Sequence, residues 1–271
     1  MSYLDYIHEH SHFIGEVHQQ PFYIEQLYNV EDLKLIPNLP FQQCVDKLTG
    51  VPLTREFIKG LFRNNELYLG YVATMLWGGL GVGGRPKHLV MAMTMPKTEV
   101  EDKIYRISEL INHGNLEMAF HSLQKTGTED NKFQGVDISY FTKLLYFLYQ
   151  GKDGLQPIIY DNWGCFIHAA ILISQGEIET LNSYYKIRLN DKGKVYINLI
   201  SNRHTGYRYA IYNDYLVRMS ELSRELGLAD SGILEEYLFG YDLTPRTARN
   251  DDNPRFFVKN FIQRFATDGS L

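Results

Sequence analysis

Two residues, Lys143 and Asp161, have the types and the spacing for covalent chemistry. Lys143 follows a turn at Gly135 and Asp137, with Ser139 as the candidate N-cap, so the lysine is expected near the first turn of a helix. The positive end of the helix dipole and burial among aromatic neighbours would both favour the neutral amine. Only the neutral amine attacks an electrophilic carbon, and the pattern therefore indicates amine nucleophilic catalysis.

Asp161 lies between the short apolar run PIIY and a helix expected to begin at Asn162. Its structural role is expected to be the N-cap of that helix. A capping carboxylate is held rigidly, so it can also stabilise a positive charge that develops beside it. The pair therefore predicts an enzyme if the amine of Lys143 and the carboxylate of Asp161 open into one cleft.

The elements that must position this pair are mainly helices, because apolar residues recur at three- and four-residue steps along most of the chain. The predicted helices are 41–50, 54–62, 65–77, 100–114, 116–127, 139–151, 162–176, 209–228, 232–240 and 254–265. The predicted capping residues are Thr54 and Asn65 at N-termini, and Gly114, Gly151 and Gly176 at C-termini. One strand is expected, over 193–200. The fold class is therefore mainly α, with at most a small β element, in a single domain over 1–271.

Composition limits the class of protein. The 271 residues are 44% hydrophobic and 22% charged, which excludes a disordered chain. The 27 basic and 32 acidic residues give a net charge of −5, so any nucleic-acid site must be a local basic patch. Two cysteines are too few for a disulfide scaffold, no apolar run is long enough to span a membrane, and the N-terminus lacks a signal-peptide layout. We expect a soluble, cytoplasmic protein with no membrane partner.

Three other patterns have a structural interpretation that we favour over a chemical one. The glycines from Gly79 to Gly84 match a dinucleotide fingerprint, but a helix precedes them where a strand is required, so we predict a connector. His8, His10, His12 and His18 lack the further ligands of a zinc site, which favours a solvated terminal segment. The arginines and phenylalanines of 244–265 are expected to form a solvated face and a core face, although phosphate contacts are an alternative.

The segment GVDISYFTKLLYFL, followed by PIIYDNW, resembles the catalytic core of the helix-hairpin-helix DNA glycosylases. It is most similar to the 8-oxoguanine DNA glycosylase branch, and the resemblance covers about residues 130–240. By this resemblance Lys143 corresponds to the nucleophile and Asp161 to the catalytic carboxylate, in a fold of helical lobes around a cleft. The chain departs from the family in reading Gly135-Val136-Asp137 where a second glycine is usual.

The resemblance implies excision of a base from duplex DNA after the nucleotide has been flipped out of the stack. Lys143 would attack C1′, Asp161 would stabilise the charge on the sugar, and a Schiff base could lead on to strand cleavage. The implied substrate is an oxidised purine such as 8-oxoguanine, or a hypermodified cytosine of phage DNA in antiviral defence. No metal or organic cofactor is implied, and we expect a monomer in a bacterial cytoplasm.

Further site residues follow from the same interpretation. The flipped base is expected to contact the side chains of Tyr140, Asn162, Phe256 and Phe257. The DNA backbone is expected to contact Gly135, Val136, Arg85, Lys87, Arg246, Arg249 and Arg255. Two alternatives remain: a non-catalytic helical module that binds nucleic acid or protein, and a Schiff-base lyase or aldolase acting on a small carbonyl compound.

Overall fold

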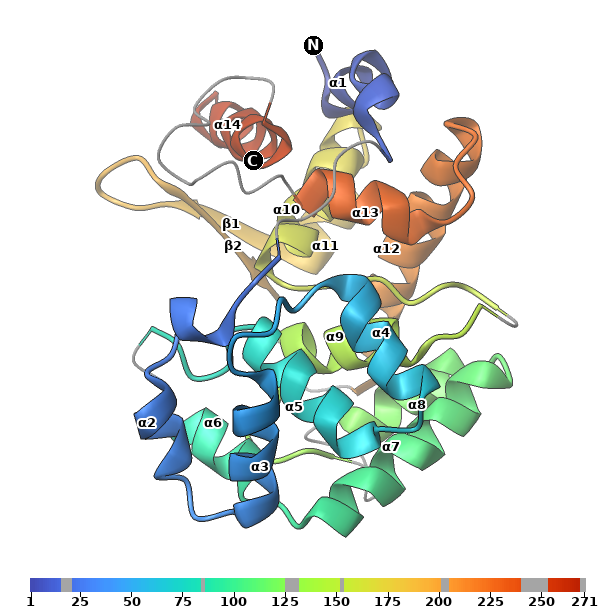
Figure 1. Cartoon of the computed structure of the whole chain (residues 1–271). Helices are drawn as coiled ribbons and strands as arrows, with labels where there is room; N and C mark the ends of the chain where they lie inside the picture. The colour runs from blue at the N-terminus through green and yellow to red at the C-terminus, as the bar shows by residue number, and fades with distance from the viewer. Residues whose placement is uncertain are drawn as a thin grey trace. The chain divides into compact units, whose positions relative to one another are not determined.

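Helices make up most of the chain in the computed structural model (Figure 1), which confirms the mainly α fold class. The structure describes residues 1–15, 21–83, 86–124, 132–151, 154–200, 205–239 and 253–268. Within these ranges there are fourteen α-helices and one two-stranded antiparallel sheet. The chain divides into two compact units. The internal unit is Gln20–Ile158, and the terminal unit combines Met1–Gln19 with Ile159–Leu271.

The internal unit is built around α5 (Leu67–Trp77), which contacts α3, α4, α7 and α9. Every residue of α5 from Gly70 to Trp77 is buried, as expected for a helix that is apolar on all sides. The other elements of this unit are η2 (Ile24–Gln26), α2 (Val30–Lys34), α3 (Leu39–Leu48), α4 (Arg55–Arg63), α6 (Pro86–Met93), α7 (Lys97–Asn112), α8 (Leu116–Leu123) and α9 (Ile138–Leu148).

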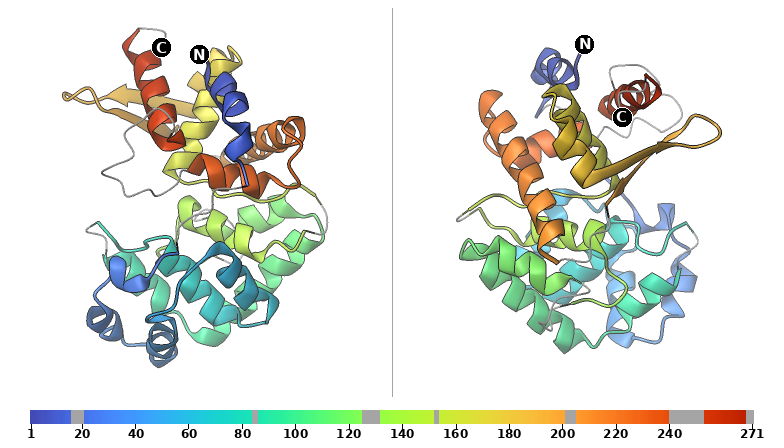
Figure 2. Two further views of the ribbon diagram at one scale, coloured as in Figure 1. Left: turned by 45° about the horizontal axis from the view of Figure 1, so that its top comes forward. Right: turned by 180° about the vertical axis from the view of Figure 1, so that it is seen from behind.

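The terminal unit is built in the same way around α10 (Asn162–Ser174), which is buried from Gly164 to Leu172. Both ends of the chain pack on this helix, because α1 and α14 each contact it (Figure 2). The other elements are α1 (Tyr3–Glu9), η1 (Ser11–Phe13), α11 (Ile178–Tyr184), β1 (Tyr185–Leu189), β2 (Val195–Leu199), α12 (Thr205–Glu225), α13 (Ser231–Phe239) and α14 (Pro254–Thr267).

The expectation of a solvated N-terminal segment holds for His8 and His12, which are exposed, but not for the apolar residues between Tyr3 and Ile7. Ser2 and Asp5 form a capping box that starts α1, and Tyr3, Tyr6 and Ile7 are fully buried. The ring of Tyr6 stacks on Phe257 of α14 with centroids 3.9 Å apart. The periodicity of α1 spans only two turns, so its burial depends on a helix from the other end of the chain.

Several predicted element boundaries need correction. Thr54 caps α4 as predicted, but Asn65 is no cap: it takes a left-handed conformation (φ 61°), and α5 begins at Leu67. Gly114 and Gly176 follow the C-caps of α7 and α10 with positive φ, as predicted, whereas α9 already ends at Leu148, before Gly151. Strand β1 and helices α1, α2, α6 and α11 were not predicted.

The described residues contain neither a membrane-spanning helix nor a cluster of metal ligands. No described helix has the length and apolar character needed to cross a membrane. The same residues contain no group of three or more histidine, cysteine, aspartate or glutamate side chains placed to hold a metal ion.

Candidate active site

Lys143 is a buried residue of α9, with 4% of its surface exposed. The cap of this helix is Asp137, whose carboxylate accepts a hydrogen bond from the Ile138 amide at 2.9 Å, so the prediction of Ser139 as N-cap is wrong. The helix therefore starts earlier than expected, and Lys143 lies in its second turn rather than its first. An aspartate can replace the second hairpin glycine here because its extended backbone (φ −114°) needs no left-handed conformation.

The amine of Lys143 is held by a hydrogen bond within its own helix, and its side chain passes close to Gly78 at the end of α5. Nζ donates a hydrogen bond to the Ser139 carbonyl at 2.9 Å and lies 5.7 Å from the centroid of the Tyr140 ring. The Tyr140 hydroxyl donates to the carbonyl of Gly79 at 3.3 Å. A Cβ atom at Gly78 would lie 3.1 Å from Cδ of Lys143 and 3.2 Å from the Tyr140 ring. The lysine and Tyr140, predicted separately, thus form one cluster that depends on a glycine at position 78.

The predicted hairpin residues precede α9. Gly135 has φ +72°, and a Cβ atom at this position would lie 2.4 Å from the backbone oxygen of His88 in α6. Glycine is therefore required both by the left-handed backbone and by the close approach of another chain segment. Val136 is buried beside it. These residues set the start of α9, and their contact with DNA stays a prediction.

Asp161 belongs to the terminal unit and caps α10, as predicted. Its Oδ1 atom accepts hydrogen bonds from the backbone amides of Trp163 at 2.8 Å and Gly164 at 3.3 Å. Two amide donors hold this half-buried carboxylate in one orientation. Asn162, the first helical residue, is exposed. The arrangement provides a fixed anion at a helix N-terminus.

The model of the family described as "Putative 8-oxoguanine DNA glycosylase OGG-like protein" matches residues 34–239. The chain belongs to this family. Comparisons with curated proteins and with solved structures find no match. The matched range contains both Lys143 and Asp161, and membership implies the helix-hairpin-helix glycosylase fold that the sequence predicted.

The remaining predicted residues of this glycosylase-family chain have different surroundings. Phe257 is 3% exposed in the ring stack with Tyr6, which indicates a core role, whereas Phe256 is half-buried. The Arg255 guanidinium lies over the rings of Trp163 (5.0 Å) and Phe239 (4.4 Å) and donates to the Phe239 carbonyl. Arg255 thus packs against the first turn of α10. Its contact with phosphate stays a prediction. Lys87 is exposed in α6, and three predicted residues lie outside the described ranges: Arg85, Arg246 and Arg249.

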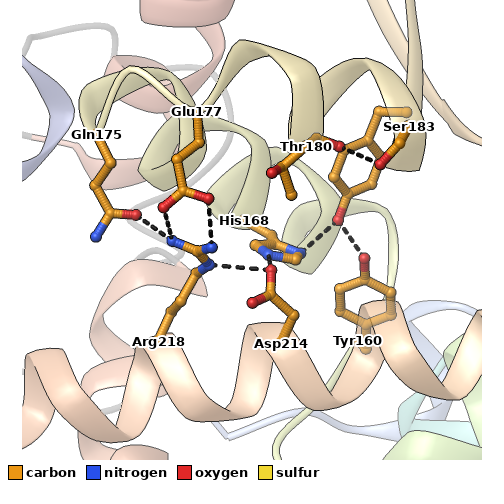
Figure 3. A network of polar contacts seen from close by, with 9 residues as sticks. Tyr160, His168, Gln175, Glu177, Thr180, Ser183, Asp214 and Arg218 are labelled. Carbon is orange, nitrogen blue, oxygen red and sulfur yellow. Dashed lines mark hydrogen bonds and ion pairs between the residues drawn. The ribbon is translucent and has the colours of Figure 1, made fainter.

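Sequence reasoning missed a polar network that begins at Tyr160, the residue before Asp161 (Figure 3). The hydroxyl of Tyr160 bonds to that of Tyr185 in β1, and the latter lies 2.7 Å from Nδ1 of His168. Nε2 of His168 lies 3.0 Å from Oδ2 of Asp214 in α12. The signal for this network was a single histidine in the apolar run CFIHAAILI. It links the segment that carries Asp161 to three other elements.

Burial shifts the pKa values in this network and thereby determines which atoms carry a proton. Burial lowers the pKa of His168, so the imidazole is neutral at pH 7. Its Nε2–H then donates to Asp214, and Nδ1 accepts the hydrogen bond of the Tyr185 hydroxyl. The Tyr185 oxygen can in turn accept from Tyr160, because burial keeps the pKa of both phenols well above the usual value. Every bond in the chain thus has one donor and one acceptor.

Arg218 closes the network on its exposed side. Its Nε donates to Asp214 at 3.0 Å, and its two terminal nitrogens each donate to Glu177 at 2.8 Å (Figure 3). Burial alone would raise the pKa of Asp214, but the hydrogen bonds from His168 and Arg218 outweigh it and hold that pKa below the usual value. The hydrogen bonds of Arg218 likewise lower the pKa of Glu177.

We expect His168 to make the protein less stable in mild acid. Because its pKa is lower in the folded than in the unfolded chain, its contribution is complete above the ordinary pKa of 6.5 and is lost as pH falls through the folded pKa. His168→Gln retains a donor for Asp214 and an acceptor for Tyr185 but does not titrate. Thermal unfolding between about pH 8 and 5 should show a smaller loss of stability in the variant than in the wild type. Equal losses would contradict the neutral buried imidazole.

Proposed function

We propose that this protein is a DNA N-glycosylase that excises an oxidised purine of the 8-oxoguanine type, with Lys143 as nucleophile and Asp161 as the stabilising anion. The observation that carries the proposal is the family match, whose range contains both a buried lysine amine and a carboxylate held by two backbone amides. Membership in a glycosylase family also favours an enzyme over the non-catalytic module and over an aldolase.

In the proposed reaction the neutral amine of Lys143 attacks C1′ of the flipped nucleotide. The C1′–N bond breaks, and the base leaves with the bonding electrons and takes up a proton. Positive charge on the sugar is greatest during this step, and the Asp161 carboxylate stabilises it. Loss of the amine proton and opening of the sugar ring give a Schiff base, from which β-elimination of the 3′ phosphate would cut the strand.

The Tyr140 ring is the proposed stacking surface for the base because it lies beside the nucleophile and is half-buried. Asn162, which is exposed next to Asp161, can offer both a donor and an acceptor to the edge of a purine.

Borohydride trapping tests the proposal, because borohydride reduces a Schiff base to a stable amine. The protein is incubated with duplexes carrying oxidised purines and, separately, with phage DNA carrying modified cytosines. A covalent adduct on the first panel that is absent in Lys143→Gln supports the proposal, and an adduct on the second panel only would change the substrate class. Abasic sites without an adduct would show that the protein excises the base without a Schiff-base or lyase step. Duplex binding with no product on either panel would indicate a non-catalytic module.

Gly78→Ala is expected to slow excision by displacing the nucleophile. The backbone at Gly78 (φ −71°) accepts alanine, but the new methyl group would press on Lys143 and Tyr140 at 3.1 and 3.2 Å. Small displacements of a reacting group reduce rates steeply, and we expect a loss of about tenfold in single-turnover rate. Gly60→Ala in α4 is the matched control, since a Cβ atom there has nothing within 4 Å. Equal rates in the two variants would argue against Lys143 as the reacting group.

A further inference from the structure

The β1–β2 hairpin of the terminal unit has two chemically different faces. The register pairs Ile187 with Ile197 on one face, where the hairpin packs on α10 and α14. On the opposite face, Lys186 is paired with Asn198 and Arg188 with Tyr196, and all four side chains are exposed. Paired residues of an antiparallel ribbon share a face, so these four form one continuous outer surface.

This outer surface and the adjoining turn are strongly basic. Residues 186–198 contain Lys186, Arg188, Lys192 and Lys194 against the single acid Asp191, a net charge of 4 − 1 = +3 in a chain whose total is −5. All four cations are exposed, and within the described part of the chain none of them forms an ion pair. The positive charge is therefore available to a partner.

Tyr196 gives the surface an aromatic component. Its side chain is 45% exposed, and Nζ of Lys194 lies 5.6 Å from the centroid of its ring. Cations that neutralise phosphates and an exposed ring that contacts sugars or bases are the typical combination of nucleic-acid-binding surfaces. A two-stranded ribbon also has dimensions that a DNA groove admits.

We propose that the outer face of the β1–β2 hairpin binds the phosphate backbone of duplex DNA. The proposal rests on the proposed function for its choice of DNA as the anionic partner. The hairpin cations increase affinity for any duplex, damaged or not, and take no part in bond cleavage.

The test measures binding to an undamaged duplex, where excision plays no part. The double variant Arg188→Gln/Lys194→Gln should raise Kd by about tenfold at low salt, and should reduce the slope of log K against log salt by about 2. The matched control Lys47→Gln/Arg106→Gln removes the same charge from exposed positions of α3 and α7 and should change neither quantity appreciably. Tyr196→Ala should weaken binding without changing the salt slope.

The outcomes separate this proposal from the proposed function. If the double variant binds the duplex as the control does, the hairpin does not bind DNA, whether or not borohydride trapping succeeds. Hairpin-dependent binding without excision leaves the surface standing and overturns the glycosylase reaction. Unchanged DNA binding together with lost binding to vesicles of anionic phospholipid would assign the surface to a membrane instead. In the active enzyme, the single-turnover rate at saturating protein should be the same for the double variant and the wild type.

Discussion

Lys143→Gln is expected to lower single-turnover excision by at least about 10³-fold and to abolish borohydride trapping. An amide nitrogen is not a nucleophile, so no covalent bond to C1′ can form. The amide can still donate to the Ser139 carbonyl, and we expect the free energy of unfolding to change by about 1 kcal/mol or less. Such a loss of rate is equivalent to about 4 kcal/mol of activation free energy.

Lys103→Gln is the matched control for this variant. Lys103 is a second buried lysine of the internal unit, and it donates to the carbonyl of Lys132 at 3.0 Å, but it is paired with Glu99 at 2.8 Å. We expect this control to be less stable than the wild type and to excise and trap at the wild-type rate per folded molecule. Excision retained by Lys143→Gln would refute the assignment of the nucleophile.

Asp161→Asn is expected to lower the excision rate by about 10²–10³-fold while leaving Tm nearly unchanged. Asparagine keeps an oxygen that can accept from the amides of Trp163 and Gly164, so α10 remains capped. It removes the negative charge, however, and with it the stabilisation of the sugar cation. Single-turnover kinetics and thermal unfolding of the same preparation separate the two effects.

Asp230→Asn provides the control for the loss of charge alone. Asp230 accepts a hydrogen bond from the Ile233 amide at 3.0 Å at the start of α13, in the same unit as Asp161. We expect its variant to retain the wild-type rate. If Asp161→Asn instead loses stability but keeps its rate per folded molecule, Asp161 is a structural residue only.

The sequence by itself determined the features that depend on neighbours along the chain. The helical periodicity around Lys143 and the N-cap role of Asp161 involve only residues within about one turn. The family resemblance rested on the same two segments, and the family match confirms it. Local reasoning was weaker where two nearby residues could do the same job: both Asp137 and Ser139 are good caps, and the structure uses Asp137.

Only the tertiary structure decided what surrounds these residues. Gly78 lies close to Lys143, which is 65 residues later in the sequence, and Gly135 lies close to His88, which is 47 residues earlier. No local sequence pattern predicts either contact. The network of His168 joins Tyr185 in β1 and Asp214 in α12. Its bonds are favoured because burying a polar atom without a hydrogen-bond partner costs free energy. Such contacts form only when distant segments pack together. Their physical cause is the shared core. The periodicity of a single helix predicts that one of its faces is buried, but it does not predict which other elements cover that face.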